Sequence, residues 1–161
     1  MAGKVKRSQV KSFLNTGTIT VPVWSLIGDG VAAATINYNP QTVDETYIHQ
    51  DSGTTEVESY KPTMPVAAKA VAGNVVFDFV DNLRVTRAVL DAAHTEIVNV
   101  WLYETPALNE YPAEKQSVGI QIDDFGGDGG TTTVINYTIN YLGDPVLGTF
   151  NPTTLAFTPN P

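Results

Sequence analysis

His49 and His94 are the two histidines of the 161-residue chain, and histidine is the side chain best suited to proton transfer near neutral pH. A hydrolytic triad also needs a nucleophile within hydrogen-bond distance of a histidine that a carboxylate orients. The chain has no cysteine and no Gly-x-Ser-x-Gly motif. His49 lies in a polar stretch, and His94 follows a segment of helical periodicity, where a cation near a helix C-terminus is favoured. The sequence therefore predicts that the protein is not an enzyme and has no catalytic residue.

Closely spaced carboxylates are the next candidates, because two of them can divide the roles of acid and base or hold a metal ion. Here they fall in expected turns and on polar strand faces, where a solvated charge is the ordinary outcome. The loop at residues 123–128 combines aspartates with glycines as calcium loops do, but it lacks the EF-hand spacing and occurs once. The sequence therefore predicts no metal site and no cofactor. The pairs are Asp44 with Glu45, Glu56 with Glu58, and Asp123 with Asp124.

The formal net charge of −8 is distributed unevenly along the chain. Four of the nine basic residues lie at or before position 11, whereas all 17 acidic residues come later. An acidic body repels polyanions, so we expect the folded part not to bind nucleic acid. The basic segment is instead expected to contact an acidic neighbouring subunit. Its residues are Lys4, Lys6, Arg7 and Lys11.

The apolar runs of the sequence are far shorter than the roughly 20 residues that a membrane-spanning helix needs. The start of the chain is polar and basic, and it does not resemble a signal peptide. We therefore expect a soluble protein that is made in the cytoplasm and is not inserted into a membrane.

The composition favours β-structure, because Val and Thr are abundant and 13 glycines and 10 prolines mark many chain reversals. One segment, at about residues 74–88, has apolar residues at helical spacing after a possible N-cap, Asn74. Elsewhere apolar and polar residues mostly alternate, and Gly143-Asp144-Pro145 is expected to end the last strand. Strands are expected at 18–23, 31–38, 42–49, 54–60, 64–71, 96–104, 118–122 and 133–141, with a loop at 105–114.

These elements predict a mainly β protein, an antiparallel β-sandwich or partial barrel with one flanking α-helix at about 74–88 and extended N- and C-terminal arms. The expected organisation is an N-terminal arm at 1–17, a β-sandwich domain at 18–147 and a C-terminal arm at 148–161. Tails with apolar anchors, on a domain whose strand edges invite pairing, are typical of a self-assembling ring or tube.

Three stretches of the chain resemble the major tail tube proteins of long-tailed bacteriophages. They are Trp24–Val31 leading into Ile36–Pro40, Thr54–Pro62 followed by the helical segment Asn74–Arg87, and Leu142–Pro152. The resemblance implies a β-sandwich with one flanking helix, six subunits in a ring, and rings stacked into a tube that conducts DNA into the host. It also implies that a long loop between early strands, here about residues 40–56, contacts the next ring.

The partners implied by the resemblance are further copies of the chain and the tape-measure, tail-tip and tail-terminator proteins. DNA would pass through without specific binding, and the protein would be assembled in the host bacterial cytoplasm and reside in the tail of the virion. Two other functions stay open. One is the inner tube of a contractile, phage-tail-like injection machine, and the other is a stand-alone β-sandwich binding module, for example for carbohydrate.

Residues are assigned to these surfaces by alternation and by position. Side chains that share one face of the strand at 133–141, together with carboxylates of partner strands, are expected to face the lumen of the tube. The arms and the long loop are expected to contact other subunits or rings. The lumen candidates are Glu56, Glu58, Asp123, Asn136, Thr138 and Asn140. The contact candidates are Lys4, Lys6, Arg7, Lys11, Asp44, Asp51, Phe150, Leu155 and Phe157.

Overall fold

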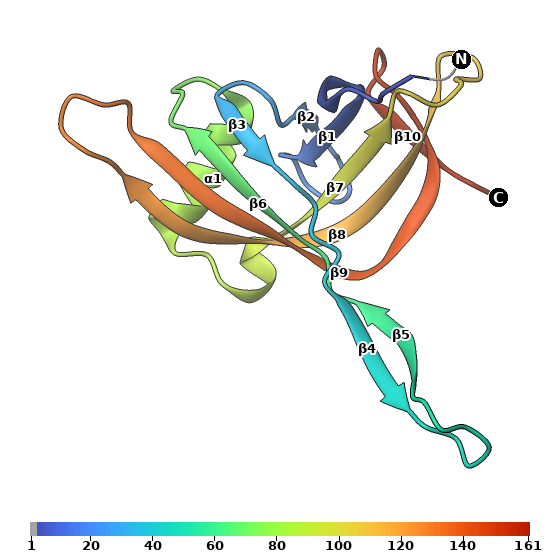
Figure 1. Ribbon diagram of the computed structural model, residues 1–161. Helices are drawn as coiled ribbons and strands as arrows, with labels where there is room; N and C mark the ends of the chain where they lie inside the picture. The colour runs from blue at the N-terminus through green and yellow to red at the C-terminus, as the bar shows by residue number, and fades with distance from the viewer. Residues whose placement is uncertain (1–2) are drawn as a thin grey trace.

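The computed structural model describes residues 3–161, so the first two positions of the predicted N-terminal arm lie outside the described residues. The chain forms a large antiparallel sheet, a separate two-stranded hairpin and one α-helix (Figure 1). The helix is α1 (Val75–Thr86), and short 3-10 helices lie at Arg7–Gln9 and Leu90–Ala93. The strands are β1 (Val10–Asn15), β2 (Trp24–Leu26), β3 (Val31–Ala34), β4 (Pro40–Glu45), β5 (Thr54–Tyr60), β6 (Thr63–Lys69), β7 (His94–Trp101), β8 (Tyr111–Gly126), β9 (Val134–Asn151) and β10 (Ala156–Pro159).

The large sheet has the strand order β2-β1-β7-β8-β9-β6-β3, and β10 pairs with the C-terminal part of β9. Its two longest strands, β8 and β9, run through the whole sheet and curve strongly, which gives a half-barrel (Figure 1). The short strands β2 and β3 form the two edges. The prediction of a mainly β, antiparallel fold with one helix is confirmed.

Helix α1 begins where the sequence predicts it. The side chain of Asn74 accepts a hydrogen bond of 3.0 Å from the backbone N–H of Phe77, which satisfies a donor that the first helical turn leaves free. The apolar face of the helix buries Val76, Val80 and Leu83 against one face of the sheet. The sheet contributes Leu14, Met64, Val66, Ala68, Ile97, Val118, Ile120, Ile135, Tyr137 and Ile139 to this core.

A second core lies on the opposite face of the sheet. Neighbouring residues of a strand point to opposite faces, so Val98 lies on the other side from Ile97. In this second core Phe13 packs on Phe150 with ring centroids 4.7 Å apart. Its remaining buried members are Trp24, Val98, Val100 and Ala113.

Both predicted arms are largely part of the sheet, which corrects the sequence-based organisation. Within the expected arm 1–17, β1 pairs with β2 on one side and with β7 on the other. Within the expected arm 148–161, β9 continues to Asn151 and β10 folds back onto it. Phe13 and Phe150 are buried because they complete the second core of their own chain, and Leu14 is buried in the first core.

The expected strands at 31–38, 42–49, 64–71 and 96–104 are shifted or shortened to the bounds of β3, β4, β6 and β7. Three further differences change how the sheet is built. Gly143 adopts a φ of 66°, and β9 bends there and continues instead of ending. Strand β8 starts at Tyr111, inside the expected loop at 105–114. The expected strand at 18–23 is a loop, held by the Asn15 side chain, whose Oδ1 accepts bonds of 2.9 Å from Gly17 N–H and 3.0 Å from Val23 N–H.

Candidate functional site

One open surface of the large sheet carries a row of polar side chains from β8 and β9, which we call the polar face. On β9 these are Asn136, Thr138 and Asn140, and on β8 they are Gln121, Asp123 and Asp124. The structure therefore brings together Asp123, Asn136, Thr138 and Asn140, four of the residues that the sequence assigned to a common surface.

Hydrogen bonds connect the polar face across the two strands. Thr138 Oγ1 donates to Asp123 Oδ2 at 2.6 Å, and Asn136 Nδ2 donates to Asp124 Oδ1 at 2.8 Å. Gln121 Nε2 donates to the other oxygen of Asp123 at 2.6 Å, and Asn140 Nδ2 donates to Gln121 Oε1 at 3.3 Å. These bonds hold short polar side chains flat on the sheet and leave carboxylates at the surface.

The side chains on the opposite side of β9 determine which of its residues point toward the polar face. Ile135, Tyr137 and Ile139 alternate with the polar residues and are buried under helix α1. Burial raises the pKa of the Tyr137 phenol, which therefore stays uncharged over the physiological range. A shift of register by one residue would exchange the two faces, so the buried side determines which residues point outward.

Glu56 and Glu58 do not lie on the polar face, which corrects their grouping with Asp123. They belong to β5, which pairs with β4 to form the projecting hairpin at the bottom of Figure 1. Asp44 lies on β4, where Thr55 Oγ1 donates to its Oδ1 at 2.6 Å, and Asp51 lies near the tip. The hairpin thus gathers carboxylates on its own separate sheet.

The hairpin has exposed apolar groups in addition to its carboxylates. Every residue of β4 and β5 is exposed or half-buried. Ile48 is fully exposed at the tip, and Tyr47 and Val57 are also exposed. A two-stranded hairpin without a core is marginally stable by itself in water. These features are typical of an element that a partner covers.

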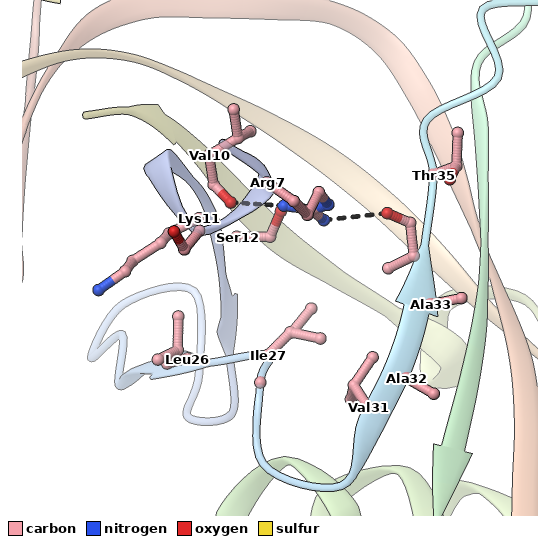
Figure 2. A pocket seen from close by; sticks show the side chains of 13 residues that line it. Arg7, Val10, Lys11, Ser12, Leu26, Ile27, Val31, Ala32, Ala33 and Thr35 are labelled. Atoms are coloured by element: carbon pink, nitrogen blue, oxygen red, sulfur yellow. Dashed lines mark hydrogen bonds between the residues drawn. The ribbon is translucent and has the colours of Figure 1, made fainter. Parts of the chain in front are cut away.

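The basic residues near the N-terminus divide into two groups. Lys4 and Lys6 are exposed and precede β1. Arg7 and Lys11 line a groove of about 590 Å³ between β1 and β3 (Figure 2). There the Arg7 guanidinium donates to the carbonyl oxygen of Val10 at 2.5 Å and to that of Ala34 at 2.9 Å. Arg7 therefore joins two strands of its own chain.

The three C-terminal contact candidates differ in exposure. Phe150 is 0% exposed in the second core, so its whole side chain is used within its own chain and its assignment as an inter-subunit anchor is corrected. Phe157 is half-buried against the same core, and the ammonium group of Lys115 lies 5.3 Å from its ring centroid. Leu155 is 41% exposed and remains a candidate for contact.

The two histidines lie on different elements, His94 at the start of β7 and His49 in the hairpin tip. His94 Nδ1 is 3.6 Å from the exposed carboxylate of Asp91, and the ring of His49 stacks on Tyr47 in the hairpin tip. Within residues 3–161, no group of three or more His, Cys, Asp and Glu side chains is placed to hold a metal ion. In the same range, no helix has the length and apolar character needed to cross a membrane.

The chain matches no protein-family model and no curated protein sequence. Its fold is similar to a chain from the tail of an empty GTA particle with C6 symmetry, with a TM-score of 0.65 and 13% identity over 96% of this chain and 99% of that one. It is also similar to the sheath/tube terminator of PVC, an extracellular contractile injection system, with a TM-score of 0.54 and 8% identity over 91% and 97% of the two chains. At such identities the likeness establishes the fold alone, and the chain therefore has a tail-tube-like fold.

Proposed function

We propose that the protein is the structural subunit of a tail tube, in which six copies form a ring and stacked rings form a conduit for DNA. The observation that carries this proposal is the whole-chain likeness to a chain from a C6-symmetric particle tail, because it covers nearly all of both chains. The tube would belong to a virion or phage-like particle. Its further partners would be the tape-measure, tail-tip and tail-terminator proteins of that particle.

The physical properties of the surfaces support this function. Closing the sheets of several subunits into one barrel would remove the exposed edges at β2 and β3. The inner wall of a DNA channel should not bind the phosphates of the passing DNA. Few lysines and arginines are therefore expected on it, because each one that neutralises a phosphate adds affinity through counterion release. The polar face presents Asp123 and Asp124 with amides and a hydroxyl, which suits a channel wall.

A second candidate function is the inner tube of a contractile injection machine. The likeness to the PVC sheath/tube terminator favours it, although with a lower TM-score than the GTA tail chain. The two functions share the ring and differ in the surrounding sheath and the cargo. Particles purified from the producing cells would distinguish them by the presence of a sheath and of DNA.

Electron microscopy of the purified full-length chain tests the proposed function directly. We expect rings with sixfold symmetry or hollow tubes, accompanied by a hexamer mass in mass photometry. A monodisperse monomer at all concentrations, salt conditions and incubation times would contradict the proposal and favour a stand-alone binding module.

Reversing the charge of the polar face is expected to slow DNA release. In particles that carry Asp123→Lys/Asp124→Lys, the new ammonium groups should bind phosphate, and release should be slower at about 50 mM than at about 200 mM salt. The measurement is the rate of DNA release from intact particles. The matched control is Asp78→Lys/Asp91→Lys, which adds the same charge at exposed residues of α1 and of the 3-10 helix that follows it. Equal rates for the two variants would show that the polar face does not line the channel.

A further inference from the structure

A pocket of about 730 Å³ lies at the base of the hairpin, where β4 and β5 leave the large sheet. It combines aromatic and acidic side chains, and among the described residues that line it there is no lysine or arginine. The tyrosines are Tyr38, Tyr60 and Tyr141, and the carboxylates are those of Glu58, Glu114 and Asp144.

Two of the tyrosines form an exposed aromatic corner. The rings of Tyr38 and Tyr60 meet edge to face, with centroids 6.4 Å apart and an interplanar angle of 82°. Tyr38 is 53% exposed and Tyr60 is 58% exposed. Part of the surface of each ring is therefore accessible to a ligand from outside.

The floor of the pocket is held in place by a buried amide. Asn99, which is 0% exposed, donates from Nδ2 to the hydroxyl oxygen of Tyr141 at 3.1 Å and to Glu114 Oε1 at 3.4 Å. Its own Oδ1 accepts a bond of 2.7 Å from Ser12 Oγ, which fixes the orientation of the amide. One carboxylate and one aromatic ring are thus positioned by the same core residue.

One side of the pocket is lined by Asp144, which follows the bend of β9 at Gly143. Gln116 Nε2 donates to the carbonyl oxygen of Gly143 at 2.7 Å, and the register between β8 and β9 shifts at this point. Asp144 and Pro145 follow the bend and line the pocket together with Glu58.

Burial and the neighbouring carboxylate of Glu114 both affect the titration of two of the tyrosines. Burial raises the pKa of Tyr38, and the charge of Glu114 raises it further. Burial raises the pKa of Tyr141 to about 12, with a smaller contribution from Glu114, against the opposing effect of the Asn99 hydrogen bond. The three carboxylates that line the pocket would attract an added cation.

The chemistry of the pocket fits a primary ammonium group on an apolar stem. Carboxylates accept charge-assisted hydrogen bonds from lysine, while tyrosine faces attract the cation and contact its methylene groups. Two other basic residues are already paired with carboxylates of their own chain. Lys115 pairs with Glu96 at 3.6 Å, and Arg84 pairs with Asp81 at 2.7 Å.

In the part of the chain that the structure describes, five lysines form no ion pair: Lys4, Lys6, Lys11, Lys61 and Lys69. Lys11 and Lys69 lie on strands of the sheet, and Lys61 adjoins the pocket within its own chain. Lys4 and Lys6 are exposed on the segment before β1, outside the sheet, from which they can reach another copy. The segment just before β1 and the base of the hairpin lie well apart on the molecule (Figure 1). A basic segment and an acidic pocket at separate places on one copy favour a head-to-tail contact between copies.

We propose that the pocket binds Lys4 or Lys6 of a second copy of this chain. This inference rests on the self-association proposed above, and it adds which segment of one subunit occupies which pocket of the next. Because the contact is head-to-tail, it propagates from copy to copy, so each subunit both supplies a lysine and receives one.

Charge reversal with compensation is the decisive experiment. We expect Lys4→Glu/Lys6→Glu, and separately Glu58→Lys/Asp144→Lys, to raise the protein concentration needed for half-maximal assembly by about tenfold or more, measured by light scattering and electron microscopy. Combining all four substitutions should restore assembly, because the charges then attract again with exchanged signs. The matched control is Asp29→Lys/Asp128→Lys, which changes the net charge equally on exposed residues away from the pocket.

The possible outcomes separate this inference from the proposed function. If the wild-type chain assembles and the pocket reversal behaves like the control, the inference is wrong while the tube function stands. If the wild-type chain stays monomeric, the tube function fails, and the pocket is tested by titrating the full chain with a peptide of residues 1–11. Weaker peptide binding by Glu58→Lys/Asp144→Lys than by the Asp29→Lys/Asp128→Lys control supports the inference, and equal or absent binding overturns it.

Discussion

A Phe150→Ala substitution is expected to lower the free energy of unfolding by about 3–5 kcal/mol, which is the usual cost of removing a buried phenylalanine ring. The side chain is 0% exposed and packs on Phe13, and Val98 and Val100 belong to the same core. Its removal leaves a cavity that strands in a curved sheet cannot easily close. Urea denaturation followed by tryptophan fluorescence measures the effect, because Trp24 lies in this core.

The control for this substitution is Leu155→Ala, because Leu155 follows shortly after Phe150 and is 41% exposed. We expect it to change the unfolding free energy by less than about 1 kcal/mol, as is usual for exposed positions. If Phe150→Ala instead left stability unchanged and blocked assembly, Phe150 would be an anchor between subunits and its place in the core would be wrong.

Removing the hairpin is expected to abolish assembly and leave the body folded. Pro40 and Tyr60 are direct partners in the β4–β5 register, so a two-residue Asn-Gly turn can replace residues 41–59 without separating the flanking segments. Both cores lie outside this range. The melting temperature should therefore change by less than about 4 °C, while electron microscopy should show no tubes.

A milder change distinguishes ring formation from stacking. Inserting a few Gly-Ser residues next to Asp51 at the tip preserves the paired strands and displaces the exposed Ile48 and Tyr47. We expect rings that do not stack. Normal tubes from both the insertion and the deletion would assign stacking to another element, either the loop before β8 or the reversal between β8 and β9.

The sequence predicted the elements whose signals are local. Helix α1 follows from the N-cap Asn74 and the spacing of Val76, Val80 and Leu83, all of which act within one segment. Strand β5 has the predicted bounds, and the alternation around Tyr137 correctly separates a buried side from a polar one. In each case a residue's environment is determined by neighbours a few positions away.

The elements that the sequence misplaced depend on distant partners. Phe13 and Leu14 are suitable for an arm or for a central strand, and only the pairing of β1 with β2 and β7 decides between them. Gly143-Asp144-Pro145 has the composition of a terminating turn. In the sheet, however, β8 shifts its register at Gln116, and β9 bends and continues.

The candidate surfaces were predicted only in part, because alternation along a strand is a local signal whereas the pairing of strands is not. Asn136, Thr138 and Asn140 share a face by alternation, and pairing of β8 with β9 adds Asp123. Glu56 and Glu58 alternate equally well, but no local signal shows that β4 and β5 leave the large sheet. The pocket at the hairpin base was not predicted, because its residues come from four separate stretches of the chain.

The place of β1 in the sheet has a consequence for the order of folding. Ser12 in β1 bonds to Asn99 in β7, a residue 87 positions further along the chain, and β6 pairs with β9. Contacts with such long sequence separation form slowly, and during synthesis they must wait for the later strands. The hairpin needs only local contacts and can form within about 1–10 μs of its synthesis. On a ribosome, the strands of the hairpin would therefore pair transiently, with marginal stability, before the large sheet forms. Any docking surface on the large sheet would exist only after β9 has been synthesised, so two unfinished chains could not join through it.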